Sequence, residues 1–175
     1  MQRIAVIYSS KYGAAKKYAT WISEALGADL FDKKKTDPAR IKSYGLVVYG
    51  GGIYAGGISG IKFILGHKPK NLVVFTVGLW NPETTDYTSM LKKNFDPAAL
   101  DEIKVFHLRG GIDYKRLGIA DRAMLAVIKK FVMDRKAPGE LTEEDRVFLK
   151  TYGGNVDYTD RSAIKPIIDY IRAKP

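Results

Sequence analysis

Short apolar runs alternate along the chain with segments of helical period, and this alternation limits the possible fold more than any other feature. Arg3 to Tyr8 is apolar and β-branched, which is typical of a strand buried on both faces. Residues 9–13 interrupt this run. From Ala14 to Leu26 apolar residues recur at helical spacing, and Gly27 supplies a C-terminal stop. The pattern predicts a strand, a tight turn and a helix.

The same alternation continues to the end of the chain. Further strands are predicted over residues 29–31, 45–49, 71–77 and 103–108, the last being the final strand of the chain. Helices are predicted near 59–65, around 85–93, over 117–136 and 142–150, and at the C-terminal end. Such alternation favours a parallel sheet with helices on both faces. We expect one α/β domain over residues 1–175, with a five-stranded sheet.

Composition narrows the available chemistry. The absence of cysteine excludes disulfides, thiolate zinc sites, iron–sulfur clusters and cysteine nucleophiles. His67 and His107 are the only histidines, so a histidine-rich metal centre is not available and we expect no metal. The net charge is +10, and residues 109–136 hold eight Lys or Arg against three Asp. This excess suits a nucleic acid, an anionic membrane or an acidic small molecule, although a solvated helix face would also explain it.

The turn after the first strand, Ser9-Ser10-Lys11-Tyr12-Gly13, leads into Ala14-Ala15. Backbone amides at a helix start point into such a turn and the helix dipole favours an anion there, so a phosphate group fits. The alternative is that Ser10 only caps the helix. No Gly-Lys-Ser/Thr occurs, which removes the main support for ATP or GTP hydrolysis. Residues 50–55 match a dinucleotide fingerprint weakly, because no acidic residue follows at the end of the next strand.

The run from Val6 to Gly13, followed by Ala19 and Ile22, resembles the flavodoxin signature. The resemblance implies a three-layer sandwich with strand order 2-1-3-4-5 and FMN as the cofactor, bound at the switch point between the first and third strands. Ala15 stands where the family usually has a threonine, which removes one hydroxyl contact. The backbone amides remain, and Lys11 or Lys16 could compensate.

The resemblance also implies which residues contact the cofactor. They come from the phosphate turn, from the loops after the third and fourth strands on either side of the flavin ring, and from the loop after the last strand. These residues are Ser9, Ser10, Lys11, Tyr12, Gly13, Ala14, Ala15, Gly51, Gly52, Ile53, Tyr54, Val77, Gly78, Leu79, Trp80, Gly110, Gly111 and Asp113. Tyr54, Trp80, Tyr87 and Tyr114 are candidates to stack on the ring, with core packing as the alternative. No catalytic acid, base or nucleophile is assigned.

The last third of the chain is similar to the flavodoxin-domain group that includes quinone-dependent protoporphyrinogen dehydrogenase. The similarity rests on Tyr114, Arg116, Asp121-Arg122, Gly153-Gly154 and Tyr158-Thr159-Asp160. It implies a cytoplasmic oxidoreductase that passes electrons from a porphyrinogen to a quinone, with peripheral association at the inner face of the membrane. A basic amphipathic helix suits both propionates and an anionic membrane. Asp113, Arg116 and Arg122 are candidates to orient the substrate, with surface charge as the alternative.

Two other functions stay open. An electron-carrier flavodoxin would serve a redox partner, but such carriers are characteristically acidic, and a charge of +10 should raise the reduction potential of the flavin. A flavin-free binding module on the same fold would be compatible with the basic charge and with Ala15. No nucleic acid is expected as the partner, because the lysines do not interleave with aromatic residues in a recognition motif. The oligomeric state is left open.

Overall fold

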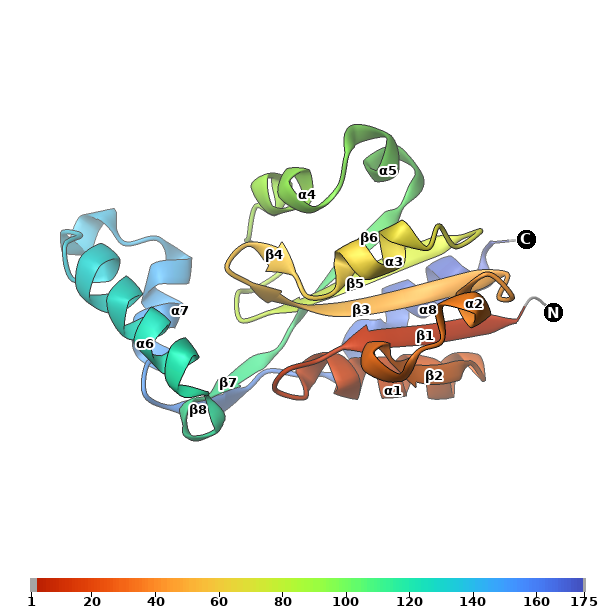
Figure 1. The fold of residues 1–175 in the computed structure, drawn as a ribbon. Helices are drawn as coiled ribbons and strands as arrows, with labels where there is room; N and C mark the ends of the chain where they lie inside the picture. Colours follow the sequence, from red (N-terminus) through yellow and green to blue (C-terminus); the bar gives the residue numbers. More distant parts are fainter. Residues whose placement is uncertain (1–2, 175) are drawn as a thin grey trace.

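A computed structural model describes residues 3–174 and shows a central sheet with the spatial order β2-β1-β3-β5-β6 (Figure 1). All neighbours in this order pair in parallel, and the short β4 adds an antiparallel strand beside the end of β3. The strands are β1 (Ile4–Ser9), β2 (Asp29–Asp32), β3 (Leu46–Tyr54), β4 (Gly57–Ile58), β5 (Leu72–Gly78) and β6 (Lys104–Arg109). The predicted α/β class and the order of the parallel strands are confirmed, and β4 is an addition.

Helices cover both faces of the sheet, because successive strand residues point to opposite sides. Val6 and Tyr8 pack with α1 and α8, whereas Ala5 and Ile7 pack with the helices of the other face. The helices of these outer layers are α1 (Ala14–Leu26), α2 (Pro38–Ile41), α3 (Ile61–Gly66), α4 (Thr88–Asn94), α5 (Pro97–Glu102) and α8 (Lys165–Arg172). Short 3-10 turns are η1 (Lys33–Lys35), η2 (Tyr114–Arg116), η4 (Pro138–Glu140) and η5 (Arg161–Ile164). The core is therefore a three-layer sandwich.

Residues 111–157 leave this core and return to it, and we call them the lid. β7 (Gly111–Asp113) and β8 (Asn155–Asp157) form an antiparallel ribbon that carries the rest of the segment. Beyond the ribbon lie α6 (Ile119–Ile128), the π-helical turn η3 (Lys129–Met133) and α7 (Glu143–Thr151), with α7 packed against η3. Figure 1 shows α6 and α7 at the end of the molecule toward which the parallel strands point.

Three sequence predictions need correction. β3 does not end at Tyr49 but runs through the glycines to Tyr54, since a Cβ at Gly50 would lie 2.0 Å from the Phe75 ring and the bare backbone lets the two strands pack. The strand predicted over 103–108 is not the last, because β7 and β8 follow it. The helix predicted over 117–136 instead runs from Ile119 to Ile128 and then widens into η3, where i to i+5 bonding changes the direction in which later side chains point.

Candidate functional site

A cleft of about 1000 Å³ lies between the carboxyl ends of the parallel strands and the lid. Its core wall comes from the β1–α1 turn, from the β3–β4 hairpin and from the loop after β5, while α6, η3 and α7 supply the opposite wall. β1 continues into a helix on one face of the sheet and β3 into a helix on the other. The cleft therefore lies at a topological switch point, where open α/β sheets bind their ligands. Its volume is at the upper end of the range for small-molecule sites, roughly 300 to 1000 Å³.

The β1–α1 turn presents backbone amides to the cleft. Gly13 precedes α1 with a φ of 102°, a conformation that favours glycine, and α1 has no side-chain cap. The first N–H groups of a helix lack intrahelical partners, and Ala14 and Ala15 line the cleft. Gly13 N donates to Ser10 Oγ over 3.0 Å, and the Ser10 hydroxyl can still donate to a ligand. The turn thus fits an anionic group such as a phosphate.

The structure brings most of the predicted cofactor residues to this one cleft. Those that line it are Ser10, Lys11, Tyr12, Ala14, Ala15, Gly52, Ile53, Tyr54, Val77, Gly78, Leu79, Trp80, Gly110, Gly111 and Asp113. All four stacking candidates, Tyr54, Trp80, Tyr87 and Tyr114, line it too. At Gly52 an added Cβ would meet nothing closer than Val77 O at 4.0 Å, so the backbone there is open to a flat ring.

Three predicted residues, Ser9, Gly13 and Gly51, are not part of the lining. Ser9 Oγ lies 3.1 Å from Ser59 Oγ and is used in that hydrogen bond. A Cβ on Gly51 would lie 2.7 Å from Ile58 and 2.8 Å from Ser59 O, so this glycine serves the packing of β3 against β4 and the residue that follows it. Gly13 contributes the turn conformation rather than a wall.

Asp121 of α6 joins the lid to the core wall. Its carboxylate is 3% exposed and accepts hydrogen bonds from the hydroxyls of Tyr12 and Tyr54, while Lys11 Nζ lies 2.6 Å from Oδ2. The same ammonium stands 4.8 Å from the centroid of the Tyr54 ring. The hydrogen bond to Asp121 is the main cause that raises the pKa of Lys11. We call these contacts of Asp121 with Lys11, Tyr12 and Tyr54 the Asp121 clasp. The clasp links the phosphate turn, the β3–β4 hairpin and the lid across the cleft.

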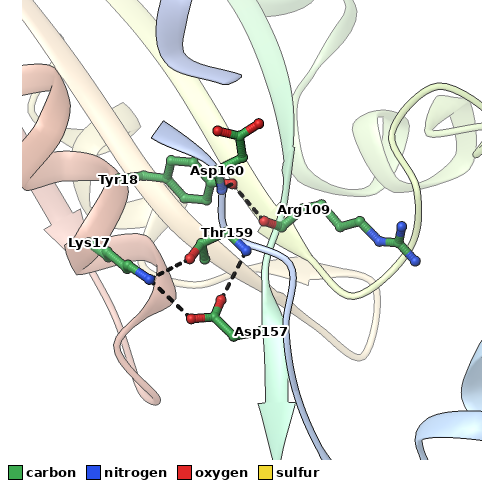
Figure 2. A network of polar contacts seen from close by, with 6 residues as sticks. All are labelled: Lys17, Tyr18, Arg109, Asp157, Thr159 and Asp160. Carbon is green, nitrogen blue, oxygen red and sulfur yellow. Dashed lines mark hydrogen bonds and ion pairs between the residues drawn. The ribbon is translucent and has the colours of Figure 1, made fainter. Parts of the chain in front are cut away.

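A second network fixes the lid where it leaves and re-enters the core (Figure 2). The Tyr18 hydroxyl of α1 donates to Arg109 O over 2.8 Å and accepts from Asp160 N over 3.1 Å. Lys17 Nζ reaches Asp157 Oδ2 at 3.0 Å and Thr159 Oγ1 at 2.6 Å, and Thr159 N donates to Asp157 Oδ1. Because one helix holds both ends of the lid, the lid has a defined position relative to the cleft.

Tyr87 and His107 form a stacked pair beside the cleft, with ring centroids 3.7 Å apart. His107 Nδ1 lies 2.7 Å from Thr76 Oγ1, and burial lowers the pKa of His107 to about 4. The imidazole is therefore neutral near pH 7 and supports Tyr87. His67 Nδ1 lies 2.6 Å from Phe63 O at the end of α3 and does not line the cleft.

The basic residues of the lid are absent from the cleft lining. Arg116 and Arg122 are exposed and absent from the lining, and Arg122 Nη2 donates to Lys115 O over 2.9 Å. Of the three substrate candidates only Asp113 lines the cleft. Phe131 of η3 is 49% exposed, whereas Met133 lines the cleft, because the wider turn of η3 changes the direction in which its side chains point.

Comparison with known proteins identifies the family. Residues 5–138 match the family described as Flavodoxin domain. The chain belongs to this flavodoxin domain family. Flavodoxins hold FMN at the β1/β3 switch point, which is where this flavodoxin domain has its cleft. The uncapped turn, the open backbone at Gly52 and the indole of Trp80 fit a phosphate and a flat ring, so FMN is the cofactor that these residues would hold.

This flavodoxin domain is similar to several solved structures at low sequence identity. Flavodoxin 2 from Bacillus cereus is 15% identical over 74% of this chain and 99% of its own, with a TM-score of 0.45. A flavoprotein from Lactobacillus acidophilus NCFM, solved in complex with FMN, is 12% identical over 62% of this chain and 93% of its own, with a TM-score of 0.42.

The Flv1 flavodiiron core from Synechocystis sp. PCC6803 is 17% identical over 62% of this chain, with a TM-score of 0.47, and this chain spans only 30% of its length. The curated proteins contain no match to the chain. Within residues 3–174, no helix is long and apolar enough to cross a membrane, and no cluster of three or more His, Cys, Asp or Glu is placed to hold a metal.

The lid wall is the part of the site that sequence reasoning missed. Asp121, Met124, Leu125 and Ile128 line the cleft at the i, i+3, i+4, i+7 spacing of one helix face, and Phe148 and Thr151 join them from α7. The signal was present, since an aspartate lies in the centre of the apolar face of the predicted helix. The sequence does not show which part of the protein this helix face packs against.

Proposed function

We propose that the cleft binds FMN and that the protein works as an FMN-dependent oxidoreductase rather than as a simple electron carrier. The single observation that carries this proposal is the lid, whose helices α6 and α7 wall the cleft opposite the proposed flavin site. A carrier needs a flavin edge that a redox partner can approach, whereas a covered site excludes water and encloses a substrate. Bound FMN would supply two-electron redox chemistry at its N5.

The chain's own residues would then bind, orient and shield. The β1–α1 turn would hold the phosphate with backbone amides and Ser10, and the open backbone at Gly52 would let the ring approach. Trp80 and Tyr54 offer aromatic faces at the ring. The Asp121 clasp would keep the lid over the site, so that solvent has less access to the reacting atoms.

The sequence resemblance adds a finer proposal, in which a protoporphyrinogen is the electron donor and a quinone the acceptor. In support, the lid carries exposed cationic residues, among them Arg116 and Arg122. Because they are absent from the cleft lining, the propionates of a porphyrinogen would meet them only at the rim of the cleft.

The outer face of the lid supports the further proposal of peripheral binding to an anionic membrane. Four of the five exposed large hydrophobic residues of the described chain lie there, namely Ile119, Val127, Phe131 and Val132. Lys130 and Arg135 are exposed among them. Apolar side chains flanked by basic ones are the pattern of a helix that lies on a lipid surface.

Vesicle binding tests the membrane proposal. The full chain should sediment with phosphatidylglycerol vesicles and not with phosphatidylcholine vesicles, and the double variant Phe131→Ser/Val132→Ser should bind at least fivefold more weakly. Lys62→Ser, which removes one exposed cation from α3, is the control and should bind like the parent. Equal binding by parent and double variant would contradict the proposal.

The oxidoreductase proposal is tested in two steps. The purified chain, titrated with FMN, should quench flavin fluorescence with 1:1 stoichiometry, and the loaded protein should then form protoporphyrin from protoporphyrinogen when menadione is the acceptor. A protein that takes up no FMN would instead be a flavin-free binding module. A protein that takes up FMN, turns over nothing and passes electrons to a redox protein would be a carrier.

A further inference from the structure

Two tyrosine hydroxyls in the cleft have no hydrogen-bond partner among the described residues, Tyr87 Oη and Tyr114 Oη. Both oxygens are buried, both residues line the cleft, and Tyr87 as a whole is 9% exposed. Thr85 and the Gly153 backbone lie near them without reaching hydrogen-bond geometry. A buried polar group without a partner costs about 1 to 3 kcal/mol. Two such groups in one cleft point to a ligand that supplies the partners.

The two hydroxyls are held in place by rigid neighbours. Tyr87 stacks on His107 at 3.7 Å with the rings 11° from parallel, and Thr76 fixes His107 in turn. Tyr114 lies edge-on to Tyr152, with ring centroids 5.1 Å apart. Since neither ring can turn without disturbing its neighbour, the hydroxyls are preorganised donors rather than mobile side chains.

The wall that the lid contributes to the cleft is largely apolar and carries no positive charge. Its apolar lining residues include Leu117, Met124, Leu125, Ile128, Met133 and Phe148. The charged lining residues of the lid are all acidic, Asp113, Asp121 and Glu144. An anionic ligand would meet repulsion here, whereas an uncharged flat ring would meet apolar contacts and methionine sulfur, which suits aromatic rings.

We propose that the lid side of the cleft is a second subsite, which binds an uncharged, flat ring compound with hydrogen-bond-accepting oxygens at its edge. Tyr114 and Tyr87 donate to those oxygens, and the apolar residues of α6 and α7 cover the ring. This inference rests on the proposed FMN site, because the ring compound would face the flavin across the cleft. The side of the lid that lines the cleft would then contact an uncharged ligand, whereas the cations of the lid do not line the cleft.

The test is an equilibrium titration of the FMN-loaded full chain with 1,4-naphthoquinone in the oxidised state, followed by the change in flavin absorbance. Tyr114→Phe and Tyr87→Phe should each weaken naphthoquinone binding about fivefold to tenfold, the effect of one hydrogen bond. Met124→Trp, which fills the subsite, should abolish binding. Naphthoquinone-2-sulfonate, which has the same ring and one negative charge, should bind at least tenfold more weakly to the parent.

The variants carry their own controls. Because neither hydroxyl bonds to another described residue, Tyr114→Phe and Tyr87→Phe should keep the parent's urea midpoint. Tyr170→Phe, on α8 against Phe106, should bind naphthoquinone like the parent. If FMN binds but naphthoquinone does not, or binds equally to every variant, the subsite is refuted and the FMN site stands. If FMN itself does not bind, both fall.

Discussion

At the scale of single residues, Asp121 has the most consequential position in the chain. It is a carboxylate on an otherwise apolar helix face, and burial would be costly for it without partners. Lys11, Tyr12 and Tyr54 supply those partners, and all three belong to the core wall of the cleft. One side chain therefore sets the position of the lid relative to the cofactor loops.

We expect Asp121→Ala to destabilise the protein by about 2 kcal/mol, because it leaves Lys11 and two tyrosine hydroxyls without their acceptor. The loss of stability is limited because Lys11 is exposed and water can solvate its ammonium group. Urea unfolding measures this. Asp134→Ala removes an exposed carboxylate paired with Lys129 and should cost less than about 0.5 kcal/mol. Equal effects of the two substitutions would show that the clasp does not stabilise the fold.

Gly50 is the second residue whose identity is dictated by a close approach. Gly50→Ala should destabilise by about 2 kcal/mol or more, because the new Cβ would lie 2.0 Å from the Phe75 ring in the centre of the sheet. Gly66→Ala, where nothing lies within 4 Å, should be neutral or slightly stabilising in the same urea experiment. A neutral Gly50→Ala would mean that the ring can move aside.

At the scale of elements, the lid is held mainly by charged contacts at its ends and between its helices. Asp145 begins α7 in a capping box with Thr142 and lies 2.6 Å from Lys136 Nζ. At the root of the ribbon, Asp157 takes hydrogen bonds from Thr159 N and Lys17. The core layers, in contrast, rest on apolar packing. The lid should therefore respond to pH before the core does.

The hydrogen bond from Lys136 lowers the pKa of Asp145 below its ordinary value of 3.8, and the Thr159 backbone N–H lowers the pKa of Asp157. Folded pKa values below the unfolded ones mean stabilisation that is complete above about pH 4 and lost as pH falls through the folded pKa. Hydrogen exchange should show α7 losing protection below about pH 4 while β3 and β5 stay protected. In Asp145→Asn this acid response of α7 should shrink; an unchanged response would exclude Asp145 as its cause.

At the scale of the whole molecule, the outer surface and the lid wall of the cleft differ in charge. The net charge is +10, yet the lid residues that line the cleft include no Lys or Arg. The cations of the lid are directed outward, beside exposed Phe131 and Val132. The positive net charge is therefore a property of the outer surface, whereas the lid wall of the cleft is apolar and acidic.

FMN at one hundred times its Kd should stabilise the folded chain by about 2.7 kcal/mol. For a chain of 175 residues that corresponds to a rise in Tm of roughly 5 to 10 °C. Riboflavin, which lacks the phosphate, should give a much smaller rise at the same concentration, because the β1–α1 turn then has no anion to bind. Equal shifts from FMN and riboflavin would show that this turn does not hold a phosphate.

The elements that could be read from the sequence are those specified by local physics. The β1–α1 unit follows from an apolar run, a turn and Gly27 at a φ of 60°, and α7 follows from its Thr142 cap. α5 carries a signal of the same kind, with Asp96 as its cap and Pro97 in its first turn, but it was not among the predicted helices. Such signals act within a few residues, so they need no knowledge of the fold.

The sequence by itself determined the α/β class, because apolar periodicity and turn chemistry are local properties of the chain. The order of the parallel strands and most of the cleft's core wall were expected from the resemblance of the segment around the first turn to flavodoxins. Only the tertiary structure decided that residues 111–157 form a lid, that Asp121 meets Lys11 across 110 positions, and that Arg122 faces solvent. A helix shows in its sequence which face is apolar but not what that face packs against. That choice depends on contacts between distant segments, which exist only once the chain has folded.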